Sequence, residues 1–375
     1  MKPKTLLTAG PSITEKEIEY VLDAVRHGWN ENWDGYLKRF EKAFAEYVGT
    51  RFALCTSSCT GALHLALLAL GIGPGDEVLV PEISWIATAS AVTYCGATPV
   101  FVDIDPETWC LDPDSARRAV TGRTRAILPV HLYGHPANMV AINRLAATCG
   151  IKVLEDAAPA LGAEVNGQKV GSLGHAATFS FQGAKIMVTG EGGMLVTDDE
   201  GLFERARHLN DHGRDPDRPF QISTIGHKYK LSNLQAALGL AQLERMTELV
   251  SRKRTIFGWY RQRLGSIAGL RLNAERRWAR NTYWMTSVVF DDELGVSRAE
   301  VIAGLKRRHI DSRPFFPPTS SFPMFSRREN ANPVAYRIAD RGLNLPSGHN
   351  LTEHDVDWVC GALLELLPGD CRRAA

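Results

Sequence analysis

The alternation of strand-like and helix-like runs over the first two thirds of the chain constrains the fold most. Short apolar runs such as "RFALC", "DEVLVP", "ATPVFVDID" and "IKVLEDA" are separated by segments whose apolar residues have helical spacing. Strands joined through a helix usually pair in parallel, because the connection returns the chain to the same end of the sheet. The pattern therefore predicts a doubly wound α/β sheet.

This rhythm breaks near Thr178. The runs "ATFSF" and "GGMLVTDD" leave no room for a helix between them, which predicts a hairpin-like or antiparallel element at a sheet edge. From about residue 255 the order is α+β, with "YWMTSVVF" as a strand and "LTEHDVDWVCGALLELL" as a last helix. We expect a large α/β domain over 1–250 and a small α+β domain over 251–375.

Two capping boxes mark helix starts. Thr14 with Glu17 opens a first helix, and Ser232 with Gln235 opens a long one. The apolar face of the first helix consists of Ile18, Val21, Leu22 and Val25. This N-terminal helical segment is assigned to the large domain.

Charge and composition exclude several functions. The chain has 43 Lys and Arg against 42 Asp and Glu, a net charge of +1, so nothing global favours nucleic acid or an anionic membrane as a partner. No run of about 18 apolar residues is present, and we expect a soluble, cytoplasmic protein. The seven cysteines form no CxxC pair, which favours reduced thiols over disulfides or a metal site.

Lys185 stands between two apolar runs in "TFSFQGAKIMVTGEGGMLVTDD". Lysine is rarely buried unless it is paired. Its amine can form a Schiff base with a carbonyl group, and a desolvated site lowers its pKa toward neutrality. The alternative is a turn lysine with its ammonium group in water.

Two further sites complement this lysine. In "CTSSCTGALHLALLALG" a strand ends in hydroxyl-bearing residues and a helix begins; such a helix N-terminus can bind an anion, with Ser57, Ser58 and Thr60 as additional donors. Asp156 ends the apolar run of "IKVLEDA", at the sheet edge where α/β proteins bind ligands. The alternative for each is an ordinary helix N-cap.

Together these features match the needs of pyridoxal 5'-phosphate. This cofactor requires a lysine for the Schiff base, an acid beside its pyridinium nitrogen, and a phosphate cradle. Trp85 in "PEISWIATASAV" follows another strand, where its ring could stack on the cofactor. Core packing is the alternative for Trp85.

The chain resembles the DegT/DnrJ/EryC1/StrS family of sugar aminotransferases along nearly its whole length. The similarity lies in "GIGPGDEVLVP", "GATPVFVDID", "VLEDAAPALGA", "KVGSLGHAATFSFQGAKIMVTGEGGMLVTDD" and "LSNLQAALGLAQLE". The resemblance implies the fold-type I (aspartate aminotransferase-like) architecture, with a mixed, mostly parallel seven-stranded sheet and a smaller C-terminal α+β domain. Through "TYWMTSVVF" and "LNLPSG" the chain looks most similar to the perosamine-synthase-like subgroup of sugar-nucleotide 4-aminotransferases.

The resemblance also implies roles for individual residues. Lys185 would be the Schiff-base lysine, and Asp156 would hold the pyridine N–H. The other cofactor-binding residues implied are Ser58, Cys59, Thr60, Trp85, Ser180 and Lys228. The substrate-binding candidates are His212, Lys230 and Arg313, cationic groups suited to a diphosphate.

Three positions depart from the family pattern. Cys59 replaces a glycine of the phosphate loop, and Pro159 stands where a polar residue usually contacts the cofactor. Lys228 in "GHKYKLSN" replaces an asparagine that reaches the cofactor phosphate of the partner subunit, and we expect it to act there as a cation.

The implied reaction moves an amino group from L-glutamate, or glutamine, to a ketosugar. The cofactor passes through its pyridoxamine 5'-phosphate form, and the acceptor expected is a nucleotide-linked 4-keto-6-deoxyhexose. The family implies a homodimer with shared active sites. Three alternatives are open: an aminotransferase for a carbocyclic ketone of the inosose type, a sugar 3-dehydratase, and a non-catalytic regulator that binds the cofactor. The dehydratases carry histidine in place of the lysine, so Lys185 argues against that alternative.

Overall fold

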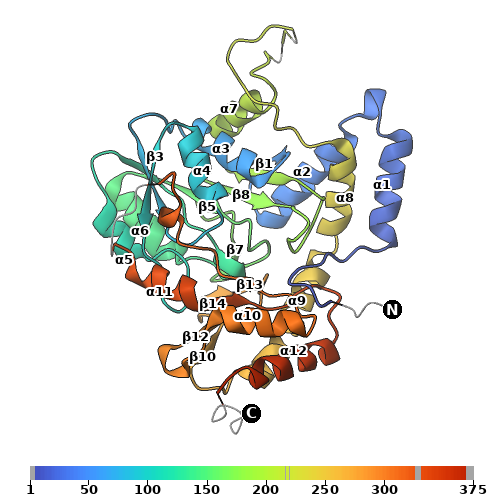
Figure 1. Cartoon of the computed structure of the whole chain (residues 1–375). Helices are drawn as coiled ribbons and strands as arrows, with labels where there is room; N and C mark the ends of the chain where they lie inside the picture. Colours follow the sequence, from blue (N-terminus) through green and yellow to red (C-terminus); the bar gives the residue numbers. More distant parts are fainter. Residues whose placement is uncertain (1–4, 216, 219, 326–330, 369–375) are drawn as a thin grey trace.

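The computed structural model describes residues 5–215, 217–218, 220–325 and 331–368 (Figure 1). Its main sheet has seven strands in the order β1-β9-β8-β5-β4-β2-β3. Their bounds are β1 Phe52–Thr56, β2 Glu77–Pro81, β3 Thr98–Val102, β4 Thr124–Ile127, β5 Lys152–Asp156, β8 Ala176–Ser180 and β9 Gly193–Thr197. The expected mixed, mostly parallel sheet is confirmed.

β9 is the strand that runs against its neighbours. It pairs antiparallel with β8, where Ser180 faces Gly193, and also with β1, where Thr56 faces Gly193. The antiparallel element was predicted correctly, but its position at the sheet edge was wrong. β1 covers β9 and forms the edge itself, a pairing between segments about 140 residues apart that no local pattern signals.

Helices cover both faces of this sheet. Strand residues alternate between two apolar cores: in β2, Leu79 points to one and Val78 and Val80 to the other. Apolar side chains of α2, α5, α6 and α8 fill the first core, and those of α3, α4 and α7 fill the second. The helix bounds are α2 Gly35–Val48, α3 Cys59–Ala69, α4 Ala87–Tyr94, α5 Pro113–Ala119, α6 Met139–Cys149, α7 Glu200–Asn210 and α8 Asn233–Leu243.

The first helix, α1 (Glu15–His27), begins at the predicted capping box. It packs beside α8 through a face that includes the buried Glu17 and Ala24. Its apolar face points elsewhere, because Ile18, Leu22 and Val25 are each between 44% and 50% exposed. The helix was predicted, but this chain alone does not cover its apolar side.

The C-terminal part is built on a second sheet, with strand order β10-β12-β14-β13, and gathers below the main sheet in Figure 1. Its strands are β10 Leu270–Leu272, β12 Ser287–Phe290, β13 Arg313–Pro314 and β14 Gly342–Asn344, and its helices are α9 Met246–Leu264, α10 Arg298–Arg307, α11 Pro333–Arg341 and α12 Glu353–Glu365. A small third sheet joins β6 (Glu164–Val165), β7 (Gln168–Lys169) and β11 (Ala279–Arg280).

α9 connects the two parts. Leu249 and Val250 belong to the core under the main sheet, whereas Ile256 and Tyr260 belong to the core of the C-terminal sheet. The boundary expected near residue 250 falls inside this helix. Among the described residues, no helix is long and apolar enough to cross a membrane.

Candidate active site

The candidate residues meet where parallel strands end. Asp156 is the last residue of β5, Ser180 is the last of β8, and Ser58 caps α3 just after β1. Because these three strands share one direction, their carboxyl ends lie at one edge of the sheet. A cavity of about 850 Å³ opens there and is lined by residues from the main sheet and from the C-terminal part.

Asp156 is buried and doubly hydrogen-bonded. The residue is only 5% exposed. Thr88 Oγ1 donates to Oδ2 at 2.8 Å, and the Ala158 amide donates to Oδ1 at 3.1 Å. Burial raises the Asp156 pKa, while the two hydrogen bonds and the charge of Lys185 oppose that shift. A cation bound beside this carboxylate would lower its pKa and be held strongly.

Lys185 lies in the turn that follows β8. Its amide donates to the Gln182 carbonyl at 2.8 Å, and its Nζ is 3.8 Å from the centre of the Trp284 ring. Burial lowers the pKa of Lys185 to about 8, against the opposing charge of Asp156. A lysine in this state is partly neutral near physiological pH, which both Schiff-base formation and proton transfer require.

The start of α3 provides the anion site. Ser58 accepts from the Gly61 amide at 3.0 Å and so caps the helix. The first amides of a helix have no partner inside it and point outward. Gly193 of β9 lies directly behind this turn, and a Cβ there would be 2.5 Å from the Cys59 amide nitrogen. Strand and turn therefore approach so closely that only glycine fits.

The structure accommodates the cysteine that stands in this loop. Cys59 is buried, and its thiol donates to Thr178 Oγ1 at 3.5 Å. Burial raises the pKa of the thiol, so it stays protonated. Its side chain extends toward β8, away from the amides of the turn. Pro159, the second departure, lines the cavity and brings no polar group.

Two candidates lie at the rim. Trp85 lines the cavity with 63% of its surface exposed, and its ring is 5.7 Å from that of Phe316. Arg313 also lines the cavity, with its Nε 3.7 Å from Asp311 Oδ2. Both side chains are placed to meet a ligand that enters.

Four predicted residues do not line this cavity within the single chain: Ser57, Lys228, Lys230 and His212. Lys228 and Lys230 both pair with Asp211, at 3.6 Å and 3.2 Å, and Lys230 also lies over the Trp33 ring. His212 adopts a left-handed backbone conformation with φ of 62°.

Sequence reasoning missed several lining residues. Thr88, in the first turn of α4 and three residues after Trp85, donates a hydrogen bond to Asp156. A hydroxyl residue at the start of that helix could have been recognised in the sequence as a candidate for the site. Tyr133 and Trp284 come from elements distant in sequence, so no local pattern indicates them. They form an aromatic wall with Phe315 and Phe316, which belong to the Pro- and aromatic-rich run "RPFFPPTSSFP", a composition suited to lining a site.

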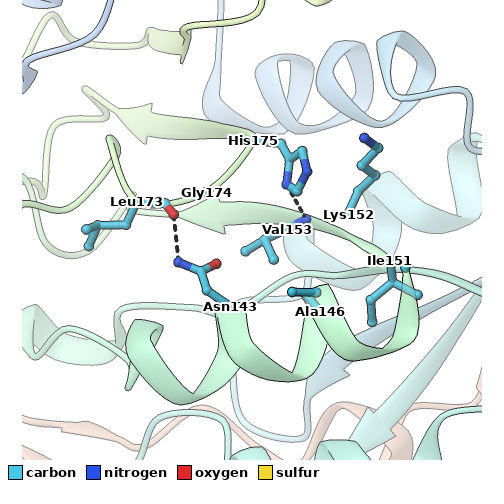
Figure 2. Close-up of a pocket in the computed structure, with 10 residues that line it drawn as sticks. Asn143, Ala146, Ile151, Lys152, Val153, Leu173, Gly174 and His175 are labelled. Atoms are coloured by element: carbon cyan, nitrogen blue, oxygen red, sulfur yellow. Dashed lines mark hydrogen bonds between the residues drawn. The ribbon is translucent and has the colours of Figure 1, made fainter.

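A second hollow, of about 490 Å³, lies at the opposite end of β5 (Figure 2). Two of its polar side chains are engaged with the backbone: Asn143 donates to the Leu173 carbonyl at 2.8 Å, and His175 Nδ1 accepts from the Val153 amide at 3.1 Å. Burial lowers the pKa of His175. No lysine–carboxylate pair like that of Lys185 and Asp156 lines it, so the larger cavity is the candidate active site.

The larger cavity fits pyridoxal 5'-phosphate. It offers an amine with a lowered pKa, a buried carboxylate and a helix N-terminus behind which a glycine strand packs closely. These are the three groups that the aldehyde, the ring nitrogen and the phosphate of the cofactor need.

Comparison with known proteins agrees with this chemistry. Residues 11–364 match the DegT/DnrJ/EryC1/StrS aminotransferase family. The chain is 43% identical to GDP-perosamine synthase of Caulobacter vibrioides, over 96% of this chain and 97% of that protein. It is similar to the structure of DesI determined in the presence of its TDP-sugar product (TM-score 0.89, 33% identity, 96% and 92% of the chains). The PLP form of a sugar aminotransferase described as putative, Spr1654 of Streptococcus pneumoniae, has a TM-score of 0.91 at 27% identity, over 99% and 100% of the chains.

Proposed function

This chain belongs to the DegT/DnrJ/EryC1/StrS aminotransferase family, and from that premise we propose that it transfers an amino group from L-glutamate to a nucleotide-linked 4-keto-6-deoxyhexose. It is a pyridoxal-phosphate-dependent transaminase. The observation that carries the proposal is the cavity in which Lys185 and Asp156 meet the α3 N-terminus. The relatives support the acceptor class, because they include a GDP-perosamine synthase and a protein with a TDP-sugar product.

Residues of this chain would hold the cofactor at three points. Lys185 would bind the aldehyde carbon, Asp156 would accept from the ring N–H, and the amides of Cys59 and Thr60 with the Ser180 hydroxyl would bind the phosphate. Trp85 covers one face of the ring from the rim. When bound, the cofactor supplies an electron sink for the electrons released at the substrate carbon. Asp156 sustains that property by keeping the ring nitrogen protonated.

Lys185 carries the proton in this scheme. Its free amine would take the proton from the Cα of the amino donor and, as the conjugate acid, would hold that proton beside the cofactor for return. With a pKa of about 8, a useful fraction is neutral at pH 7 to 8 and its conjugate acid still donates. The same proton movements in reverse aminate the ketosugar.

Arg313 is proposed to bind the substrate diphosphate, and its position in the lining of the cavity supports this role. A guanidinium group can bind a phosphate through two parallel hydrogen bonds. Lys230 and His212 are proposed as further contacts, but they lie outside the cavity of their own chain. They would act only on a site formed with a second copy.

We propose that this second copy forms a homodimer with shared sites. The exposed apolar residues Ile18, Leu22 and Val25 of α1 support such an interface. So does Lys228, whose side chain is 60% exposed and whose proposed role lies in the partner's site.

Mixing two inactive variants tests shared sites. In a hybrid of Lys185→Ala and Lys228→Ala subunits, one site carries both defects and the other carries both native lysines. We expect activity to return on mixing after subunit exchange. Two variants that stay as inactive together as apart, in demonstrated hybrids, would contradict a shared site at Lys228.

The alternatives are less well supported. The relatives named above act on sugars rather than on carbocyclic ketones. Lys185 argues against a 3-dehydratase, and membership of an aminotransferase family argues against a non-catalytic regulator.

A substrate panel tests the function directly. Purified enzyme is incubated with glutamate or glutamine and with nucleotide-linked 4-keto, 3-keto and carbocyclic ketones, and products are identified by mass spectrometry. We expect amination of a nucleotide-linked 4-keto-6-deoxyhexose with release of 2-oxoglutarate, and none with Lys185→Ala. Turnover of an inosose alone would overturn the acceptor class while leaving the transaminase chemistry intact.

A further inference from the structure

The face of the Trp284 ring packs against the Lys185 amine. Trp284 lies just before β12 and is 5% exposed. The Lys185 Nζ is 3.8 Å from the ring centre, well within the range of a cation–π interaction. The wall of the cavity therefore includes a partner for the lysine that the reaction described above does not use.

The structure fixes this ring relative to the lysine. The indole Nε1 donates to the carbonyl of Ala184, the residue before Lys185, at 2.7 Å. The Tyr133 ring stacks on it with centres 6.3 Å apart and planes at 26°. The Trp284 carbonyl in turn accepts from Lys253 Nζ at 3.1 Å. Because the ring is tied to the backbone of the lysine turn itself, the two move together.

A ring in this place acts on the charge of the lysine. An aromatic face attracts an ammonium group and does little for a neutral amine, so it raises the lysine pKa. Burial acts in the opposite direction. The titratable groups that face the same amine are the Asp156 carboxylate and the Cys59 thiol, and the thiol is protonated.

We propose that Trp284 is a positioning residue for Lys185: its face holds the ammonium group while the lysine carries the proton that it has taken from the substrate. The inference rests on the proposed role of Lys185 as the cofactor lysine. A lysine free to rotate would lose its alignment at each turnover, since long side chains have high rotamer entropy. The indole face keeps the protonated Lys185 side chain in one position beside the reacting atoms.

The test is the titration of Lys185 in the full-length chain after the cofactor has been removed with hydroxylamine. Acylation by acetic anhydride across pH, with mass spectrometry of the Lys185 peptide, reports its pKa. We expect Trp284→Leu to lower that pKa by about half to one unit. Trp284→Phe should lower it less, because both variants lose the hydrogen bond to Ala184 but phenylalanine keeps an aromatic face.

Trp109→Phe is the matched control. Trp109 is 2% exposed and packs on Phe315 and on Tyr133, the ring that also stacks on Trp284, but it does not line the cavity. We expect no change in the Lys185 pKa. An unchanged pKa in Trp284→Leu, or an equal fall in Trp109→Phe, would overturn the proposal.

If Trp284→Leu does not fold, its Lys185 will titrate like an exposed lysine, with a pKa raised rather than lowered, and Trp284→Phe then decides alone. This titration uses neither cofactor nor substrate. Its failure is therefore distinct from failure of the proposed function, which would show as absent transamination in the wild-type enzyme.

Discussion

Two lysines of this chain whose pKa is lowered by burial invite comparison. Lys253 in α9 is 2% exposed, and its Nζ donates to the carbonyls of Trp284 and Ser347. Burial lowers its pKa to about 7. Lys185 also has a pKa lowered by burial, to about 8. Yet Lys185 opens on a large cavity and feels the charge of Asp156, whereas Lys253 is enclosed and has backbone oxygens as its hydrogen-bond partners.

The difference separates a catalytic lysine from a structural one. A lowered pKa reports only that the ammonium group has lost water. Chemistry also requires space for a substrate and a second titratable group nearby. Lys253 instead joins the loop that contains Trp284 to the loop that contains Ser347. The Ser347 amide in turn donates to the Thr8 carbonyl, and Gly10, two residues after Thr8, lines the cavity.

Replacing each lysine gives the largest contrast. We expect Lys185→Ala to reduce steady-state turnover by at least about 10³-fold, because both covalent attachment and proton transfer are lost. Lys253→Met should keep most of the activity, since no atom of Lys253 reaches the cavity. Initial rates with glutamate and the accepted ketosugar measure both. An equal loss in the two variants would remove the distinction.

Asp156→Asn tests the carboxylate whose charge acts on Lys185 and which has no counterpart among the causes that shift the pKa of Lys253. An amide cannot balance a positive ring nitrogen, and we expect kcat to fall about 10²-fold, in the range seen when one electrostatic contact to a transition state is removed. The asparagine oxygen can still accept from the Ala158 amide, and its NH2 group can donate to the Thr88 hydroxyl, so the fold should persist. Circular dichroism controls for folding. A kcat near that of the wild type would show that the carboxylate charge is dispensable.

Lys253→Met tests the structural lysine through pH. The folded pKa of about 7 lies below the unfolded value of about 10.4. Between these values the unfolded chain binds more protons, so this lysine makes stability rise with pH, by up to about 1.4 kcal/mol per unit. Below pH 7 the full cost of burying the charge is present.

Urea unfolding of the wild type and of Lys253→Met at pH 7, 8 and 9 measures how the free energy of unfolding changes with pH. Lys185 is present in both proteins and contributes equally, so the difference between the two slopes is due to Lys253. We expect Lys253→Met to have the flatter dependence. Parallel curves would mean that Lys253 keeps an ordinary pKa in the folded protein.

Cys59→Ala gives the smallest effect. The thiol faces Lys185, but burial keeps it protonated, so it carries no charge that could act on the amine. We expect the Lys185 pKa, measured by acylation of the cofactor-free chain, to be unchanged. A clear fall would show that a thiolate helps to hold the lysine charged.

Much of this site could be predicted from sequence. Lys185, Asp156 and Ser58 each follow a strand whose pattern is readable, and parallel strands deliver their carboxyl ends to one edge. Trp284 could not be found in this way, because it reaches the cavity from a separate sheet more than 90 residues away. The partners of Lys228 and Lys230 likewise depend on loop geometry that no periodicity encodes.

The fold shows the same division. Alternating strands and helices predicted the α/β class, since local patterns dictate each element. The insertion of β9 between β8 and β1 depends on a pairing distant in sequence. The periodicity of α1 predicted a helix but not which side packs, because its buried face carries Glu17, held by Arg245 and Gln242.

Locating the cofactor tests the central claim most directly. The enzyme is loaded with pyridoxal 5'-phosphate, reduced with borohydride, digested and mapped by mass spectrometry. We predict one pyridoxyl group, on Lys185, and an unmodified Lys253. A pyridoxyl group on Lys253 or on any other lysine, with Lys185 unmodified, would contradict the account.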